Sequence, residues 1–322
     1  MVRLIDMARN IPSQGIDESS AALKLQKRLK LVFLINFILM CIEIFVCPIF
    51  KKAHLELLIM EKDDIVLDQF YTNDDVVDSC ISTIEFDDYD IIIEPSAGDG
   101  AFYNKITGEK IGIDLEPKVD GLIEQDYLKF NRFIFTDKKI LVIGNPPFGK
   151  NSSLAVQFFN HSAEFAKTIA FILPRTFRKT SVINRLDKNF NLVLEKILPT
   201  KSFHLSDGAK YDVPCVWQIW KKGSIRPTIE IETTHQDFEF LKSKEGANFV
   251  VQRVGGKAGW THKSLDKAFP SHYWIKGDDS VYLKMVSINW DYEDSPKFDT
   301  AGNPSISKND LIKEYKKLDI AV

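Results

Sequence analysis

Short apolar runs alternate with mixed polar and apolar segments between about residues 60 and 222. β-branched and other apolar residues are concentrated in six runs, at 91–93, 110–113, 140–143, 168–173, 192–197 and 215–220. Continuous apolar runs of this length are typical of strands that are buried on both faces. Because helical or loop segments separate them, the pattern predicts β/α alternation, with a mainly parallel sheet and helices on both of its faces.

The segment at 153–167 has the period of an amphipathic helix. Its buried face would consist of small and apolar residues that recur at helical spacing, Ala155, Phe158, Phe159, Ser162 and Ala166. Either Ser152 or Ser153 can cap the first turn through its hydroxyl group. We therefore expect one of the helices that cover the sheet to begin here.

Residues 1–59 have a different character, because a polar start leads into an apolar run at 31–50. About twenty helical residues can just span a bilayer. Lysines and arginines flank the run, and the positive-inside bias would leave the larger C-terminal part outside the cell. Three interpretations stay open: a membrane anchor, a helix packed on the next domain, and an upstream extension before a second start at Met60.

After about residue 223 the alternation is lost, and glycine, proline and aromatic residues become frequent. Ser307 and Asp310 have the spacing of a capping box, which predicts a final helix through about Lys317. The sequence predicts a smaller, irregular C-terminal region.

Composition places the chain among globular proteins, with 44% hydrophobic and 27% charged residues in a length of 322. The formal net charge of -3 excludes a protein that coats nucleic acid non-specifically, so contacts with phosphates would come from local basic patches. The four cysteines, Cys41, Cys47, Cys80 and Cys215, form no CxxC pair, which favours a reduced compartment without a structural metal. Cys80 and Cys215 lie in apolar segments and are expected to be buried thiols.

The segment at 91–102 reads Ile-Ile-Ile-Glu-Pro-Ser-Ala-Gly-Asp-Gly-Ala-Phe, a buried strand that enters a glycine-containing turn. Gly98 and Gly100 would let the backbone approach a bound ligand closely. We expect a helix after the turn, whose N-terminal amides would favour anionic groups. Such a turn also serves dinucleotides and purely structural purposes.

Two acidic residues follow at the ends of successive expected strands. Asp114 ends the apolar run after the turn and is placed to accept both hydroxyls of a ribose. Asp126 precedes Tyr127 and Leu128, so its carboxylate could accept from an adenine amino group while the neighbouring side chains flank the ring. Their regular placement favours a nucleoside-containing ligand.

The motif Asn145-Pro146-Pro147-Phe148 directly follows the expected strand at 140–143 and Gly144. Two prolines fix the backbone and remove amide donors, which leaves carbonyl groups free to accept. The Asn145 side-chain oxygen and the Pro146 carbonyl could therefore bind both hydrogens of one amino group. Phe148 offers a flat apolar face on which a planar base can stack.

The order of these motifs resembles that of the S-adenosylmethionine-dependent amino-methyltransferase superfamily. The motifs are the Phe-Tyr-Thr segment at 70–72, the Glu-Pro-Ser-Ala-Gly-Asp-Gly turn, the two acids and the Asn-Pro-Pro-Phe motif. The resemblance is to N6-adenine-specific enzymes with the cofactor-binding half first, and it covers roughly residues 65–220. It implies a doubly wound, seven-stranded class I methyltransferase fold, which is Rossmann-like. The implied organisation is an N-terminal extension at 1–59, a methyltransferase domain at 60–222 and a substrate-recognition region at 223–322.

The resemblance also implies roles for individual residues in binding S-adenosylmethionine. The methionine part would be lined by residues of the Phe-Tyr-Thr segment and of the glycine turn, Thr72, Glu94, Ala97, Gly98 and Gly100. Asp114 would bind the ribose, and Asp126 with Tyr127 would bind the adenine. The motif ends in Phe148 where tyrosine is more frequent, and phenylalanine there is similar to RNA cap-adenosine enzymes as well as DNA enzymes.

Two acid-free basic segments could hold a nucleic-acid substrate. The first lies between Glu164 and Asp187 and contains Arg175 and Arg178. The second lies between Glu245 and Asp266 and contains Arg253, Lys257 and Trp260. Cations beside an exposed aromatic ring suit backbone phosphates and a stacked base.

We therefore expect an intracellular methyltransferase that acts on the exocyclic amino group of adenine in nucleic acid, with DNA favoured over RNA. A membrane tether through 31–50 stays an open alternative. A second candidate is a protein glutamine-amide methyltransferase, because a side-chain amide presents the same two hydrogens and that family shares the motif. A third is a catalytically silent methyltransferase-like binding protein.

Overall fold

The computed structural model describes residues 70–131, 137–205 and 208–320. The chain divides into two compact units, residues 1–65 and 66–322, and the described residues all belong to the second. The apolar run at 31–50, with Cys41 and Cys47, lies outside the described residues. Within the described residues, no helix is both long and apolar enough to cross a membrane.

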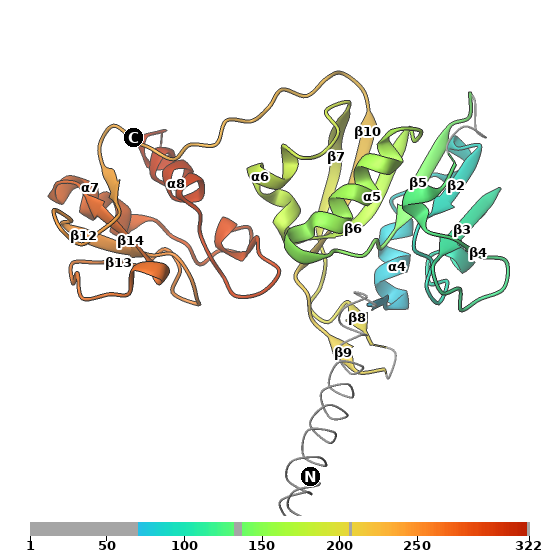
Figure 1. Cartoon of the computed structure of the whole chain (residues 1–322), viewed down its shortest axis with the longest axis horizontal. Helices are drawn as coiled ribbons and strands as arrows, with labels where there is room; N and C mark the ends of the chain where they lie inside the picture. The colour runs from blue at the N-terminus through green and yellow to red at the C-terminus, as the bar shows by residue number, and fades with distance from the viewer. Residues whose placement is uncertain (1–69, 132–136, 206–207, 321–322) are drawn as a thin grey trace, which may run out of the picture. The chain divides into compact units, whose positions relative to one another are not determined.

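Seven strands form the main sheet, and the six strands expected from the sequence are all among them (Figure 1). Across the sheet they stand in the order β4 (Ile123–Glu124), β3 (Lys110–Asp114), β2 (Ile91–Glu94), β5 (Ile140–Gly144), β6 (Thr168–Pro174), β10 (Cys215–Lys222) and β7 (Phe190–Ile197). Strand β10 is antiparallel to both of its neighbours, and the pairs among the other strands are parallel. One reversed strand inserted next to the edge is the topology of class I methyltransferases, so the expected fold is confirmed.

Helix α5 (Ser153–Ala163) buries the face that the sequence predicts: Ala155, Phe158, Phe159 and Ser162 are all buried, as is Ala166 just beyond its end. The helix ends before residue 167, because the Lys167 amide already donates to the Ile140 carbonyl of the sheet at 2.8 Å. The expected serine cap is not made. The Ser152 hydroxyl instead lies 2.6 Å from the Thr176 hydroxyl.

The connection between β2 and β3 lacks the helix expected after the glycine turn. Residues 95–109 contain only a single 3-10 turn, η3 (Tyr103–Lys105). Both Gly98 and Gly100 adopt positive φ angles, at 50° and 81°, and the chain then has few residues left in which to reach β3. The turn therefore takes the space in which a regular helix would form.

A separate three-stranded sheet positions the Phe-Tyr-Thr segment. It consists of β1 (Tyr71–Thr72), β8 (Phe203–His204) and β9 (Lys210–Tyr211), all antiparallel. The Asn73 amide donates to the Ser202 carbonyl at 3.0 Å, and the Asn73 side chain donates to the Lys201 carbonyl at 2.8 Å. Segments about 130 residues apart in sequence thus fix each other, which holds β1 beside the main sheet. Helix α4 (Asp74–Ile81) begins directly after it.

The C-terminal region is more regular than the sequence predicts. An antiparallel sheet has the order β11 (Glu239–Leu241), β14 (His272–Lys276), β12 (Phe249–Gln252) and β13 (Thr261–His262). With helices α7 (Asp279–Ser287) and α8 (Lys308–Ile320) it encloses a second hydrophobic core. These strands are only two to five residues long, which is too short for a clear alternation to show in the sequence.

The capping box expected at the start of α8 is confirmed. The Asp310 amide donates to the Ser307 hydroxyl at 3.1 Å, and the Ser307 amide donates to the Asp310 carboxylate at 2.8 Å. The helix runs to Ile320, three residues beyond the expected end.

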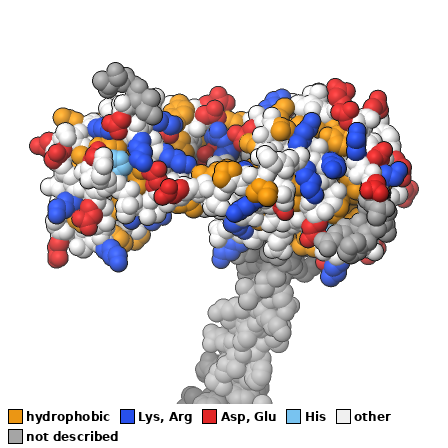
Figure 2. All heavy atoms as spheres, turned by 90° about the horizontal axis from the view of Figure 1, so that it is seen from above, with side chains coloured by type: hydrophobic (Ala, Val, Ile, Leu, Met, Phe, Trp, Pro, Cys, Tyr) orange, Lys and Arg blue, Asp and Glu red, His pale blue; other side chains and the backbone are white. Residues whose placement is uncertain are grey.

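Charged side chains of both signs are interspersed on the face that Figure 2 draws. This agrees with the small formal net charge of the chain. The main buried charges form a cluster around Asp299, whose side chain is only 8% exposed. Asp299 pairs with Arg175 at 3.3 Å and with Arg178 at 3.0 Å, and Arg178 also contacts Glu195 and the exposed Asp294. The two arginines therefore fix the segment around residue 299 to the end of β6.

The substitution Asp299→Ala should lower the free energy of unfolding by roughly 3 to 5 kcal/mol, because it leaves the buried Arg175 guanidinium without its carboxylate. Urea denaturation followed by tryptophan fluorescence would measure the change. Asp294→Ala is the matched control, since its side chain is 65% exposed. It should cost less than about 1 kcal/mol. Equal effects of the two substitutions would contradict the structural role given to Asp299.

Candidate active site

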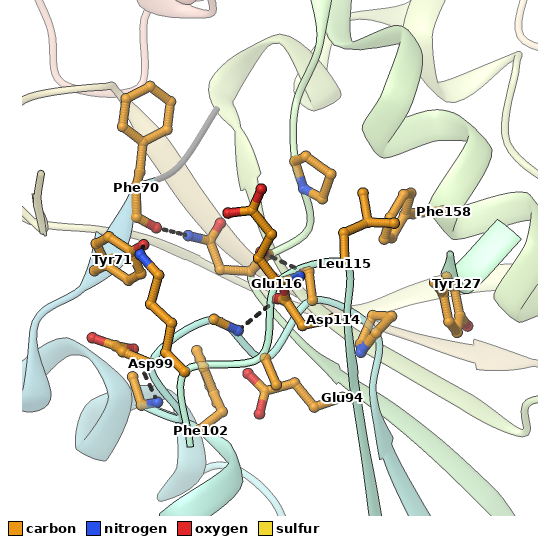
Figure 3. Close-up of a pocket in the computed structure, with 18 of the residues that line it drawn as sticks. Phe70, Tyr71, Glu94, Asp99, Phe102, Asp114, Leu115, Glu116, Tyr127 and Phe158 are labelled. Carbon is orange, nitrogen blue, oxygen red and sulfur yellow. Dashed lines mark hydrogen bonds between the residues drawn. The ribbon is translucent and has the colours of Figure 1, made fainter. Parts of the chain in front are cut away.

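A cavity of about 370 Å³ opens at the carboxyl edge of the main sheet (Figure 3). Four neighbouring strands bring polar side chains to it: Glu94 ends β2, Asp114 ends β3, Asp126 follows β4 and Asn145 follows β5. Ligands of open α/β sheets bind outside the carboxyl ends of the strands, where the strand order reverses. Strand β2 is the first strand of this sheet along the chain, and it has β3 on one side and β5 on the other. The strand order therefore reverses at β2, and the cavity lies at this reversal.

The Asp114 carboxylate is held by two backbone amides. Its Oδ2 atom accepts from Gly98 at 2.7 Å, and its Oδ1 atom accepts from Glu116 at 2.8 Å. Each oxygen keeps a second lone pair. A rigid carboxylate with two free acceptor positions suits the two adjacent hydroxyls of a ribose, as the sequence predicts.

Three amides of the glycine turn are already used within the protein. Besides the Gly98 amide, the Ala97 amide donates to the Ile113 carbonyl at 3.0 Å and the Gly100 amide to the Ala97 carbonyl at 2.7 Å. A phosphate site at such a turn requires free amides and a helix N-terminus. The structure has a 3-10 turn here instead of a helix N-terminus. This argues against a bound dinucleotide, which the glycine turn by itself would also allow.

Glu94 is 2% exposed and carries an unpaired oxygen. The Tyr103 backbone amide donates to its carboxylate, while Oε2 has no hydrogen-bond partner among the described residues. Burial raises the pKa of Glu94 well above its usual value. Gly144 provides the space, because a Cβ atom there would lie 3.2 Å from Glu94 Cγ. A buried carboxylate of this kind favours a cationic or hydrogen-donating ligand group.

The far side of the cavity is apolar. Tyr127, Leu128 and Phe158 line it, and the Asp126 carboxylate lies at its edge, where it accepts from the Leu128 amide at 3.0 Å. Tyr127 is buried, and its hydroxyl lies 2.7 Å from the Ser162 hydroxyl. The ring of Tyr127 is therefore held in place, so this wall can accept a flat heterocycle beside one carboxylate.

Asn145 has an amide group whose orientation is fixed. Its Nδ2 atom donates to the Phe70 carbonyl at 3.1 Å and to the Thr72 hydroxyl at 3.3 Å (Figure 3). Since a carbonyl can only accept, the amide nitrogen must face Phe70, and the oxygen must face the other way. That oxygen, Oδ1, is buried and has no partner among the described residues. The site thus presents an unsatisfied acceptor, which is costly unless a ligand donates to it.

The rest of the Asn-Pro-Pro-Phe motif is rigid, but it does not all face the cavity. The Ser96 hydroxyl donates to the Asn145 carbonyl at 3.0 Å, and the amides of Leu154 and Ala155 donate to the Phe148 carbonyl. Pro147 lines the cavity, while Pro146 is buried. The Phe148 ring is 7% exposed and belongs to the core, so the stacking surface expected from it is not offered to the cavity.

Several residues that line the cavity were given no role of their own from the sequence. Phe70 packs on Phe148 and stacks on Tyr211, with ring centroids 6.4 Å and 4.5 Å apart. Lys118 contacts the Tyr71 hydroxyl and lies over the Tyr71 ring. Lys118 follows Asp114 by only four positions, and Phe70 precedes Thr72 by two. Proximity to the expected residues was therefore the available signal.

The basic residues singled out from the sequence lie away from this cavity. Arg175 and Arg178 are engaged by Asp299, so the structure gives them a stabilising role where phosphate contacts were expected. Arg253 lies over the Tyr273 ring, 5.3 Å from its centroid. Lys257 and Trp260 belong to the loop between β12 and β13.

Cys80 and Cys215 are buried free thiols, as expected. Burial raises the pKa of the Cys80 thiol to about 12, and it raises the pKa of Cys215 as well. A thiol with a raised pKa is a poor nucleophile.

No protein-family model and no curated protein sequence matches the chain. Among solved structures, the chain is similar to a modification subunit of a putative type I restriction enzyme from Vibrio vulnificus, at 15% identity and a TM-score of 0.38, over 53% of this chain and 49% of that one. It is also similar to a putative RNA methyltransferase from Pyrococcus horikoshii, at 15% identity and a TM-score of 0.38, over 50% of this chain and 90% of that one. A third similar structure is the 23S rRNA methyltransferase ErmE, at 13% identity and a TM-score of 0.36, over 50% of this chain and 72% of that one.

The chain spans about half the length of the first of these structures. At such identities and TM-scores, the likenesses assign neither a family nor a substrate. The strand order and the geometry of the cavity carry the functional conclusion instead.

Proposed function

We propose that the protein is an S-adenosylmethionine-dependent methyltransferase that acts on the exocyclic amino group of adenine in nucleic acid, with DNA favoured over RNA. The observation that carries this proposal is the buried and unpaired Oδ1 atom of Asn145, which is held in one orientation beside the cavity. An acceptor of this kind requires a donor, and an amino group supplies one.

Asn145 would act on the electronic state of the amine. The lone pair of an aromatic amino group is delocalised into the ring, so the nitrogen is a poor nucleophile. When Asn145 Oδ1 and the Pro146 carbonyl accept its two hydrogens, they favour a tetrahedral nitrogen whose lone pair can attack. Because the acceptors are fixed before the substrate arrives, the site does not have to reorganise during the reaction. The released proton would pass to solvent.

The charges of the cavity fit the proposed cofactor. Five carboxylates line it, those of Glu94, Asp99, Asp114, Glu116 and Asp126, against one lysine, Lys118. When bound, S-adenosylmethionine supplies an electrophilic methyl group on a sulfonium and carries an ammonium group as well. Glu94 and the turn residues Ala97 and Gly98 would hold the methionine part, Asp114 the ribose, and Asp126 with Tyr127 the adenine. Gly100 is not among the residues that line the cavity, so its expected contact with the cofactor is not supported. Positioning of the two reactants would supply much of the rate.

The full chain, incubated with methyl-labelled S-adenosylmethionine, should label polynucleotide more than whole-protein extract. Duplex DNA, single-stranded DNA and RNA form separate arms. Labelling of protein alone would instead assign a glutamine-amide methyltransferase, and absence of cofactor binding would assign a silent binding protein.

Asn145→Ala should keep the fold and cofactor affinity but lower kcat by about a hundredfold or more, because it removes an acceptor whose bond strengthens as the amine becomes tetrahedral. Single-turnover transfer to the preferred polymer measures the effect, with calorimetry as the control for cofactor binding. Transfer at the wild-type rate would refute the mechanism.

Thr72→Val should slow transfer by roughly tenfold, since the hydroxyl that helps to hold the Asn145 amide is replaced by a methyl group of similar size. Thr72→Ser keeps the hydroxyl and should restore most of the rate. Both variants are to be compared at saturating cofactor, so that a change in affinity does not enter the result. If valine were as fast as threonine, the Phe70 carbonyl alone would be sufficient to orient the amide.

Binding of the cofactor should release protons at pH values below the raised pKa of Glu94 in the free protein. The raised pKa of Glu94 falls when a cationic group binds beside it, so affinity rises as pH increases toward the pKa of the free protein. Calorimetry in two buffers of different ionisation enthalpy measures the number of protons released. Glu94→Gln should abolish this proton release. If the variant released as many protons as the wild type, Glu94 would not be the group that loses a proton when the cofactor binds.

A further inference from the structure

We propose that the loop between β12 and β13 and the neighbouring turn before β14 bind an unpaired stretch of the DNA substrate. This inference rests on the proposed function and adds a second contact region to it. The surface consists of Lys257, Trp260, His262, Lys267 and Phe269, with the buried His272 beneath it, and we call it the β12–β13 surface.

The loop is built as a defined platform. The Gly259 amide donates to the Gln252 carbonyl at 2.7 Å, and the Gln252 amide donates to the Trp260 carbonyl at 2.8 Å. Gly259 has a φ of 96°, and a Cβ atom there would lie 2.3 Å from the Trp290 ring. The loop backbone therefore packs directly on the buried Trp290. This packing fixes Trp260, the next residue.

Two aromatic side chains are exposed here, Trp260 on the loop and Phe269 in the turn before β14. Trp260 is 45% exposed and Phe269 is 48% exposed. The Lys257 ammonium lies over the Trp260 ring at 4.5 Å from its centroid, and the Phe269 ring contacts the edge of Trp274. An indole with one cation beside it can stack a base while the cation contacts the adjoining phosphate.

The charge around these rings is positive. Residues 246–272 hold four lysines or arginines, of which Lys257 and Lys267 belong to this surface, against one acid, Asp266. Burial and the neighbouring Lys267, His272 and Lys257 lower the pKa of His262, so the ammonium groups of Lys257 and Lys267 lie near its ring. The His262 and His272 rings lie 6.3 Å apart. Such a local concentration of cations is complementary to a phosphate backbone.

Neighbouring cations of the same segment are used within the protein and do not belong to the surface. Lys263 pairs with Asp279 and lies over the Tyr282 ring. Arg253 lies over Tyr273. Lys257 carries no such ion pair among the described contacts, and its ammonium adjoins an exposed ring, so it can contact an added phosphate.

An unpaired strand fits this surface better than a duplex. Stacking on Trp260 requires the face of a base, and in a duplex both faces are covered by neighbouring base pairs. The target adenine must also leave its base pair for its amino group to reach Asn145. A strand unpaired around the target would therefore present both the amine and a base that can stack.

The test uses the full chain and a labelled single-stranded DNA of mixed sequence, about 20 nucleotides long, which exceeds the 4–16 nucleotides that one binding fold commonly covers. Trp260→Ala should weaken its affinity by roughly five- to a hundredfold, and Trp260→Phe should retain most of it. Lys257→Ala should reduce the slope of log affinity against log salt by about one unit.

Lys244→Ala is the matched control, because Lys244 is exposed but lies in the connection before β12, at the other end of that strand. It should change neither the affinity nor the salt slope. Urea denaturation midpoints would show that each variant is folded.

Equal affinity of Trp260→Ala and wild type overturns the inference, as does an effect of Trp260 that appears only with duplex DNA or only with RNA. Binding of an acidic peptide in place of DNA also overturns it. The methylation assay keeps the two proposals apart. If the wild type transfers methyl groups and Trp260→Ala binds the DNA as tightly as the wild type, only the proposed surface is contradicted. Binding without transfer by the wild type would contradict the proposed function instead.

Discussion

The site depends on the bond between the side-chain amide of Asn145 and the carbonyl of Phe70. This bond determines which end of the amide faces the cavity, and so it determines whether the site offers an acceptor or a donor there. Phe70 can make it only because β1 is held by β8, and β8 by β9. A small sheet, whose strand β1 also lines the cavity, therefore fixes the orientation of a side chain that follows a strand of the larger one.

Burial gives that acceptor its effect. The Asn145 oxygen and the second oxygen of Glu94 both lack partners among the described residues, and both lie in a cavity rich in carboxylates. In bulk water such groups would exchange one hydrogen-bond partner for another at little gain. Inside the protein the folded chain bears the cost of leaving them unpaired, and a donating or cationic ligand relieves it.

The sequence predicted the elements whose signals are local. Strands such as 140–143 are unbroken apolar runs, and Asn145 and Asp114 follow their strands directly, so their meeting at one edge followed from parallel pairing. Contacts between distant segments were less accessible. Nothing near Arg175 in the sequence indicates Asp299, and nothing near Phe148 indicates that its ring packs in the core with Phe70. The C-terminal sheet was missed because its strands are too short to show a period.

The reversed strand of the main sheet has a consequence for synthesis of the chain. Strand β10 lies between β6 and β7 but follows both in sequence, so until residue 222 has emerged neither of the earlier strands can pair on that side. A nascent chain at that stage exposes two apolar strand edges, which are templates for pairing with another molecule. The part of the protein that closes the sheet is thus made after the Asn-Pro-Pro-Phe motif. A ribosome-bound intermediate would hold every residue of the cavity while still being open to aggregation.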